Sequence, residues 1–236
     1  MTIKAISRWR RYIWVVSLMI VTLGYLILAK APATPTSVAR PQLAFGSGAG
    51  FWHTNGRQIE DSNGQPVRIT GINWFGMDTN TFCPHGLWIR NWVDMLNQIR
   101  GLGYNALRLP FCSQMLDPGS TPNSINFNVN PDLQGLTGLQ ILDKIVNQCG
   151  AIGLRVILDR HALEAGNRTA LWYDGTFTEQ RWISDWTMLA ERYRNNTAVV
   201  AADLHNEPHS PACWGCGAQP WIGGSRRSER AMPYWR

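Results

Sequence analysis

The first 40 residues contain no aspartate or glutamate, although they hold six of the 22 Lys and Arg residues in this 236-residue chain. The last 16 residues, 221–236, are also unbalanced, with four Arg and one Glu. The remaining 180 residues carry 12 basic and 15 acidic groups, so the net charge of +6 comes from the two ends. A mildly acidic central part argues against nucleic acid as a partner.

Cysteine is scarce, and its five positions do not form a metal-ligand pattern. Cys213 and Cys216 make up "CWGC", but a zinc ribbon needs a second such pair, and the sequence has none. A redox C-x-x-C would lie between a strand and a helix start, whereas this pair lies in Pro/Gly-rich sequence. We expect a Cys213–Cys216 disulfide, a candidate pair of Cys83 with Cys112, and a buried free thiol at Cys149. We expect neither a metal nor a cofactor.

The N-terminal basic residues precede an uninterrupted apolar stretch at 12–29. A basic segment followed by an apolar one is typical of an export signal. The stretch is nearly long enough to cross a bilayer, so a retained membrane anchor is the alternative. Both alternatives place the rest of the chain outside the cytoplasm, secreted or anchored. We therefore assign residues 1–40 to a signal peptide or anchor plus linker.

Strand and helix patterns alternate through the central part of the chain. Asn-Gly turns at Asn55 and Asn63 predict a small β-hairpin first. The alternation that follows predicts an α/β fold with parallel strands, either a (β/α)8 barrel or an open doubly wound sheet. The first strand is not followed by a Gly-rich phosphate loop, so a nucleotide site is not expected. The expected strands are 67–76, 105–111, 154–161 and 198–208, and the expected helices are 87–103, 133–153 and 178–194.

Chemically distinctive residues fall at the carboxyl ends of these expected strands. They are Trp74, Arg108, His161, Asn206 and Glu207. Catalytic residues of a (β/α)8 barrel gather at that rim of the barrel, contributed by several strands. The sequence therefore predicts an active site there.

The motifs "GINWFG", "NALRLPF", "LDRH" and "LHNEPH" together resemble glycoside hydrolase family 5, in particular its bacterial endoglucanase-like members. The resemblance runs from about Trp52 to Trp221. It implies a (β/α)8 barrel and retaining hydrolysis of β-1,4-glycosidic bonds in cellulose-like polysaccharide. Its implied roles are general acid/base for Glu207, a bond to the sugar 2-hydroxyl for Asn206, orientation of the partner carboxylate for Arg108, and lining of the −1 subsite for His161.

Tryptophan rings can stack on sugar faces, so several tryptophans are candidates for substrate binding. We favour Trp172, in "TALWYDG", and Trp74, and consider Trp88 and Trp214 as well. Core packing is the alternative for each of them.

Two histidines flank the Asn-Glu-Pro motif. We expect His205 and His209 to bind substrate, with bonding to loop backbone as the alternative.

The chain departs from the family pattern after the fourth strand. The resemblance places the nucleophilic glutamate on the seventh strand, but the only acid after Glu207 is Glu229, in "RRSERAMP". We therefore expect residues 41–221 to be the N-terminal half of a catalytic barrel, truncated after the fourth strand. The tail at 222–236 is anomalous, and a frameshift is our hypothesis for it. Such a chain would be inactive, and a non-catalytic glycan-binding remnant is the alternative function.

Overall fold

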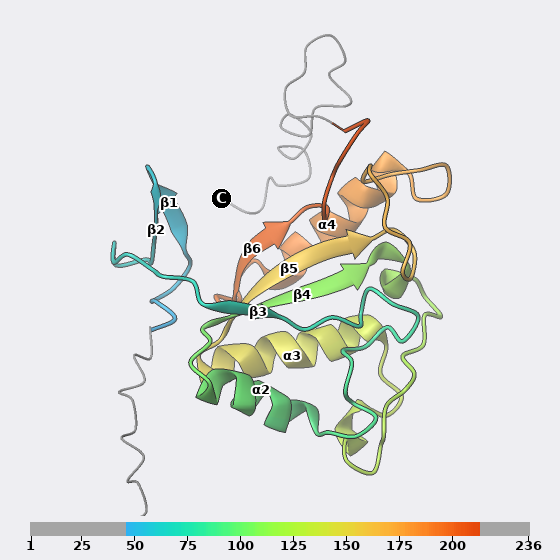
Figure 1. Ribbon diagram of the computed structural model, residues 1–236, viewed down its shortest axis with the longest axis horizontal. Coiled ribbons are helices and arrows are strands. Elements are labelled where there is room, and N and C mark those ends of the chain that lie inside the picture. The colour runs from blue at the N-terminus through green and yellow to red at the C-terminus, as the bar shows by residue number, and fades with distance from the viewer. Residues whose placement is uncertain (1–45, 213–236) are drawn as a thin grey trace, which may run out of the picture. The chain divides into compact units, whose positions relative to one another are not determined.

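Four parallel strands form the main sheet in a computed structural model of the protein, which describes residues 46–212 (Figure 1). The strands lie in the order β3 (Gly71–Asn73), β4 (Ala106–Cys112), β5 (Arg155–Ala162) and β6 (Val199–Asp203). Helices α2 (Trp92–Gly101), α3 (Gly138–Ile152) and α4 (Glu179–Tyr193) connect successive strands. The predicted parallel α/β fold is confirmed, and this sheet with its crossover helices fits a partial (β/α) barrel.

The two outer strands are shorter than the sequence predicts. Only three residues of the expected strand 67–76 pair with β4, and all three are exposed. The last strand ends at Asp203 rather than at residue 208. Both are the edge strands among the described residues, so each has one hydrogen-bonding partner in the sheet. Asn206 and Glu207 consequently lie in the turn after β6 rather than on the strand.

The predicted hairpin is present. Strands β1 (His53–Asn55) and β2 (Gln58–Glu60) pair antiparallel, and Asn55 lies opposite Gln58. Gly56 in the connecting turn has a φ of 58°, a left-handed conformation that glycine adopts without a Cβ clash.

Helix α2 begins later than the apolar spacing predicts. Its N-cap is Asn91, whose side chain accepts from the backbone N–H groups of Val93 and Asp94. The preceding residues form turns, so Ile89, expected on the buried helix face, is 70% exposed. The Thr178 N-cap of α4 is confirmed, because its hydroxyl accepts from Arg181 N–H.

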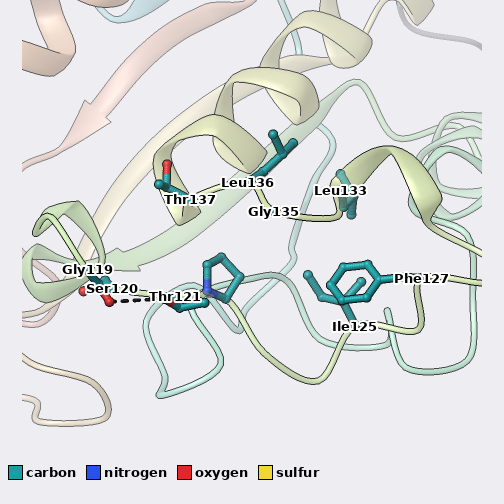
Figure 2. A pocket seen from close by; sticks show the side chains of 10 residues that line it. Gly119, Ser120, Thr121, Ile125, Phe127, Leu133, Gly135, Leu136 and Thr137 are labelled. Atoms are coloured by element: carbon teal, nitrogen blue, oxygen red, sulfur yellow. Dashed lines mark hydrogen bonds between the residues drawn. The ribbon is translucent and has the colours of Figure 1, made fainter.

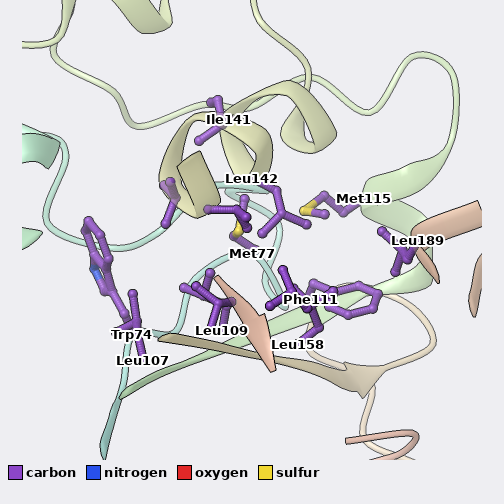
Figure 3. Packing of buried hydrophobic residues seen from close by; sticks show 14 of the residues in the cluster. Trp74, Met77, Leu107, Leu109, Phe111, Met115, Ile141, Leu142, Leu158 and Leu189 are labelled. Carbon is purple, nitrogen blue, oxygen red and sulfur yellow. The ribbon is translucent and has the colours of Figure 1, made fainter. Parts of the chain in front are cut away.

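The apolar core lies between the sheet and the helices (Figure 3). Alternate residues of β4, namely Leu107, Leu109 and Phe111, point to one face of the sheet and belong to the same buried cluster as Leu142 of α3. The other face carries the side chains between them, including Arg108. A single strand thus supplies the core on one face and a polar group on the other.

Among residues 46–212, no helix has the length and apolar character needed to cross a bilayer. The predicted signal or anchor at 12–29 lies outside the described residues, as do the Cys213–Cys216 disulfide candidate, Trp214 and the tail at 222–236.

The predicted pairing of Cys83 with Cys112 is wrong. Both are buried free thiols, and each donates to a backbone carbonyl, Cys83 to Asn123 and Cys112 to Met77. Burial raises the pKa of each thiol to about 11, so both are held in the unreactive protonated form. The prediction of a buried free thiol at Cys149 is confirmed.

Candidate active site

The guanidinium of Arg108 is the centre of a polar cluster on the face of the sheet away from the helices. Its Nη1 lies 2.9 Å from Asp159 Oδ2, and its Nη2 lies 2.7 Å from Asp203 Oδ2. The same Nη2 donates to Asn206 Oδ1 at 2.9 Å. Nη1 also donates, at 3.4 Å, to Asn73 Oδ1 on β3. One cation therefore joins all four strands of the sheet.

Strand register explains why these groups meet. Asn73 pairs with Arg108 across β3 and β4, and Asp159 pairs with Asp203 across β5 and β6. The two carboxylates are thus level in neighbouring strands, and the long arginine side chain reaches them from β4. Arg108 is the third of seven residues of β4, so its Cα does not lie at the carboxyl end of the strand. Its long side chain extends along the strand and brings the guanidinium to the rim.

His161 joins the cluster through Asp159. The two residues are two positions apart on β5, so their side chains share a face. His161 Nδ1 lies 2.7 Å from Asp159 Oδ2, and a carboxylate oxygen accepts, so Nδ1 donates this bond. Burial raises the pKa of Asp159, while the bond from His161 and the charge of Arg108 favour its ionised form.

Glu207 lies in the turn beyond β6 with an exposed side chain. Its carboxyl has no hydrogen-bond or ion-pair partner within residues 46–212. Its neighbour Asn206, 9% exposed, is the residue that Arg108 holds. The structure therefore brings together Arg108, His161 and Asn206 of the predicted catalytic set, and it places Glu207 next to them on the chain with its carboxyl in solvent.

His205 is buried with both ring nitrogens bonded inside the protein, so its assignment to substrate binding is wrong. The residue is 7% exposed, and its Nε2 donates to Thr169 O at 2.8 Å. Its Nδ1 lies 3.5 Å from Arg160 Nη1, which donates to it. Both ring nitrogens are used inside the protein, as the alternative of backbone bonding anticipated. His209 is exposed, and its Nδ1 donates to Glu207 O at 2.8 Å.

Acidification should lower the free energy of unfolding, because His205 is buried in its neutral form. Burial, reinforced by the charge of Arg160, lowers the pKa of this imidazole to about 4, although Thr169 and Asp203 act in the opposite direction. In the unfolded chain the imidazole titrates near 6.5, so between about pH 6.5 and 4 the unfolded state binds a proton that the folded state does not. Protonation of this group in the unfolded state therefore lowers the free energy of unfolding as the pH drops, by about 3 kcal/mol at pH 4.

Urea denaturation of the wild type and His205→Gln at pH 7 and pH 4.5 measures this effect. The wild type should lose more free energy of unfolding than the variant, because glutamine does not titrate. Equal losses would show that His205 does not titrate as proposed.

Two tryptophans predicted as sugar-stacking platforms are core residues, so that prediction is wrong for both. Trp172 is 5% exposed and packs against Trp182 and Tyr173. Trp74 is 6% exposed, and its indole N–H donates to His85 O. A ring whose faces are covered by protein has no free face for a pyranose.

Trp88, considered at first with the other tryptophans, has the exposed ring. It is 47% exposed and lies in the turns before α2, beyond the carboxyl end of β3. Its ring meets His85 edge-on at 5.4 Å between centroids, and His85 meets Phe75, which is 52% exposed, at 4.6 Å. These three rings form an aromatic row, exposed at Phe75 and Trp88 and half-buried at His85, which we call the Phe75–Trp88 row.

Asp159, Asp203 and Asn73 are members of the site that were not predicted from the sequence. The signal for Asp159 was available, since it lies two residues before His161 in "LDRH" and shares its strand face. Asp203 is likewise the last residue of β6. Asn73 lies in the quoted motif "GINWFG", but no titratable neighbour marks it as a member of the site.

A pocket of about 300 Å³ lies elsewhere, between the loop 119–127 and the start of α3 (Figure 2). The hydroxyl groups that line this pocket form hydrogen bonds with neighbouring residues of the protein. Ser120 donates to Gln114 O, and Thr137 accepts from Gln140 N–H. None of the candidate catalytic residues lines it. We therefore place the site at the Arg108 cluster. Within residues 46–212, no group of three or more His, Cys, Asp and Glu side chains is arranged to hold a metal ion.

Known proteins that are similar to this chain indicate a single family. An endoglucanase from Paenibacillus polymyxa is 45% identical over 192 residues, which cover 79% of this chain and 48% of the relative. The major extracellular endoglucanase of Xanthomonas campestris pv. campestris is 44% identical over 201 residues, covering 82% of this chain and 42% of the relative. The chain thus spans about half, or slightly less, of the length of these relatives.

Solved structures agree. The catalytic domain of the Xanthomonas endoglucanase superimposes with a TM-score of 0.73 at 43% identity, covering 78% of this chain and 53% of that one. A Pyrococcus horikoshii endocellulase in complex with cellotetraose gives a TM-score of 0.73 at 36% identity, covering 79% and 55%. Residues 60–228 match the model of the cellulase family, glycosyl hydrolase family 5. The chain belongs to glycosyl hydrolase family 5.

Proposed function

We propose that this chain carries the acid/base half of a retaining β-1,4-glucan hydrolase, with Glu207 as the proton donor to the glycosidic oxygen. The observation that carries the proposal is the bond from Arg108 to Asn206, the residue next to Glu207, at 2.9 Å. It ties the turn that bears Glu207 to the polar cluster on the open face of the sheet. The endoglucanase relatives and the cellotetraose complex support a β-glucan oligosaccharide as the substrate class.

Each group in the cluster has a role in this proposal. Protonation by Glu207 makes the glycosidic oxygen a better leaving group, and the same carboxylate then deprotonates water. Asn206 bonds the sugar 2-hydroxyl, and His161 presents Nε2 to the sugar at the cleaved bond. Arg108 supplies fixed positive charge that orients and keeps ionised a neighbouring carboxylate.

A retaining mechanism needs a second carboxyl about 5–5.5 Å from the first, to act as the nucleophile. Glu229 is the one acid that follows Glu207 in the 236 residues. We therefore propose that the 236-residue polypeptide by itself does not hydrolyse β-1,4-glucan. We also propose an extracytoplasmic location, for which the basic and apolar N-terminal pattern and the extracellular relative are the support.

Completion of the barrel tests the catalytic role. Residues 46–221 would be joined to the C-terminal half of the Paenibacillus polymyxa catalytic domain, which supplies the remaining strands. The hybrid should hydrolyse carboxymethylcellulose, whereas the 236-residue chain should not. Glu207→Gln in the hybrid should lower kcat about 100-fold or more, because general acid–base catalysis typically contributes at least that factor. A Glu207→Gln hybrid with unchanged kcat would refute the assignment.

The second candidate, a non-catalytic glycan-binding function, is favoured by one observation, the Phe75–Trp88 row with its two exposed rings. Aromatic faces bind the apolar faces of sugar rings without any carboxylate. Affinity of the 236-residue chain for cello-oligosaccharides that survives Glu207→Gln, together with an inactive hybrid, would favour this function over hydrolysis.

Trp88→Ala should weaken binding of cello-oligosaccharides to the 236-residue chain. An aromatic stacking contact is worth about 0.5–1.5 kcal/mol, so the Kd should rise about 2- to 13-fold. The free energy of unfolding should stay within about 0.5 kcal/mol, because the ring is largely exposed. Isothermal titration calorimetry with cellotetraose measures the Kd, and Ile89→Ala, at a neighbouring exposed position, is the control. An unchanged Kd in Trp88→Ala would remove the ring from the binding site.

A further inference from the structure

The turn that carries Glu207 is in a backbone conformation that its own sequence disfavours. Glu207 has a φ of 49°, in the left-handed region, although it is not glycine. That conformation costs an L-residue roughly 1–2 kcal/mol. Pro208 follows, and a proline biases the residue before it toward an extended conformation. Contacts outside the turn must therefore hold Glu207 in place.

The chain is held firmly on the strand side of Glu207. The indole N–H groups of Trp182 and Trp186 both donate to Leu204 O, at 3.0 and 3.1 Å. Both tryptophans come from α4 and are buried. Asn206 N–H donates to Arg160 O at 3.1 Å, so the backbone remains attached to β5 after β6 has ended.

The two histidines hold the remaining part of the turn. His205 Nε2 donates to Thr169 O at 2.8 Å, and burial keeps its imidazole neutral, with a pKa of about 4. His209 Nδ1 donates to Glu207 O at 2.8 Å, which fixes the peptide group that Glu207 shares with Pro208. The backbone N–H of His209 donates to Ala170 O at 3.4 Å. The His205 side chain therefore connects the turn to the loop at 169–170, and the His209 side chain braces the turn from within by bonding Glu207 O.

We propose that His205 and His209 are positioning residues that hold Glu207 in its left-handed conformation, His205 by attaching the turn to Thr169 O and His209 by bonding Glu207 O. Their effect on catalysis rests on the proposed function of Glu207, whereas their effect on its backbone does not. This assignment explains why imidazoles flank Glu207, since both act on the backbone of the turn that carries its carboxyl.

NMR of the labelled 236-residue chain tests the backbone effect directly. The intraresidue NOE between the amide hydrogen and Hα is strong at positive φ and weak at negative φ, and it would be measured for Glu207. His205→Gln retains a donor at the place of Nε2, so the NOE should stay strong. His205→Asn retains an acceptor for Arg160 but loses that donor, so the NOE should weaken. His209→Ala removes the bond to Glu207 O from an exposed position and should weaken it as well.

A strong Glu207 NOE in folded His205→Asn would overturn the proposal, even if that variant had lost stability, because a merely structural histidine changes stability and not this conformation. If His205→Asn does not fold, His209→Ala decides the outcome, and retention of the NOE there overturns the proposal.

The completed-barrel hybrid then separates this inference from the function on which it rests. His205→Asn should lower kcat about 10- to 100-fold with little change in KM, since a small misplacement of a catalytic group has effects of that size. His205→Gln should restore most of the lost kcat. An inactive parent hybrid would refute the proposed function, yet the NOE would still decide the role of the histidines. An active hybrid with unchanged kcat in His205→Asn would refute the positioning role in catalysis.

Discussion

Arg108→Leu should destabilise the fold by about 3–5 kcal/mol, the usual effect of removing one partner of a buried ion pair. The reason is that the buried carboxylate of Asp159 would lose its cationic partner. Asp159 is fully buried, and its Oδ1 has no partner within residues 46–212. Without Arg108, only His161 would remain to stabilise its charge. Urea denaturation at pH 7 measures the change in the free energy of unfolding.

Arg192→Leu is the matched control for that measurement. Arg192 also pairs with an aspartate, Asp143, but both side chains are partly exposed. Exposed pairs contribute about 1 kcal/mol or less, so this variant should be only slightly destabilised. Asp159→Leu combined with Arg108→Leu should recover much of the loss, because the unpaired buried charge is then gone. Equal losses at Arg108 and Arg192 would contradict this account of the cluster.

Trp172→Ala should also destabilise the fold by about 3–5 kcal/mol, the typical cost of truncating a buried aromatic side chain. Trp172 packs against Trp182, and its indole N–H donates to Glu179 Oε1. Its carbonyl also accepts from the buried Arg160. Thermal and urea denaturation of the 236-residue chain measure the change.

Trp88→Ala is the matched control, since the same truncation occurs at a ring that is 47% exposed. It should leave stability nearly unchanged and weaken glycan binding. If Trp172 were instead a stacking platform, its truncation would have little effect on stability and a large effect on affinity. The two variants together therefore decide between core packing and sugar stacking at each position.

Helix boundaries show where sequence reasoning succeeded and where it failed. The Thr178 cap was predictable because a cap is a local contact between a side chain and the next turn. The start of α2 was not, because the apolar spacing continues through Leu87 while Asn91 caps the helix. Leu87 is fully buried, but it lies in a turn that happens to face the core. Periodicity reports burial, and burial alone does not distinguish a helix from a well-packed turn.

The candidate site also contains residues that the sequence predicted and residues that it did not. Arg108, His161 and Asn206 were found because they belong to motifs that span or follow the strands of one parallel sheet, although Arg108 lies early in β4 and Asn206 lies beyond β6. The choice among tryptophans failed, because a loop position such as that of Trp172 is consistent with both stacking and burial. Its environment depends on α4, whose packing is decided by residues far away in the chain.

Local sequence determined the parallel alternation of strands and helices, the hairpin, the cap of α4 and the presence of an acid after the fourth parallel strand. Each depends on contacts within a few residues or on a repeating pattern of apolar side chains. Only the tertiary structure decided that Arg108 joins two aspartates, that Cys83 and Cys112 remain free, and that Trp88 has the open ring. Those outcomes depend on distances between segments tens of residues apart, which no local pattern contains.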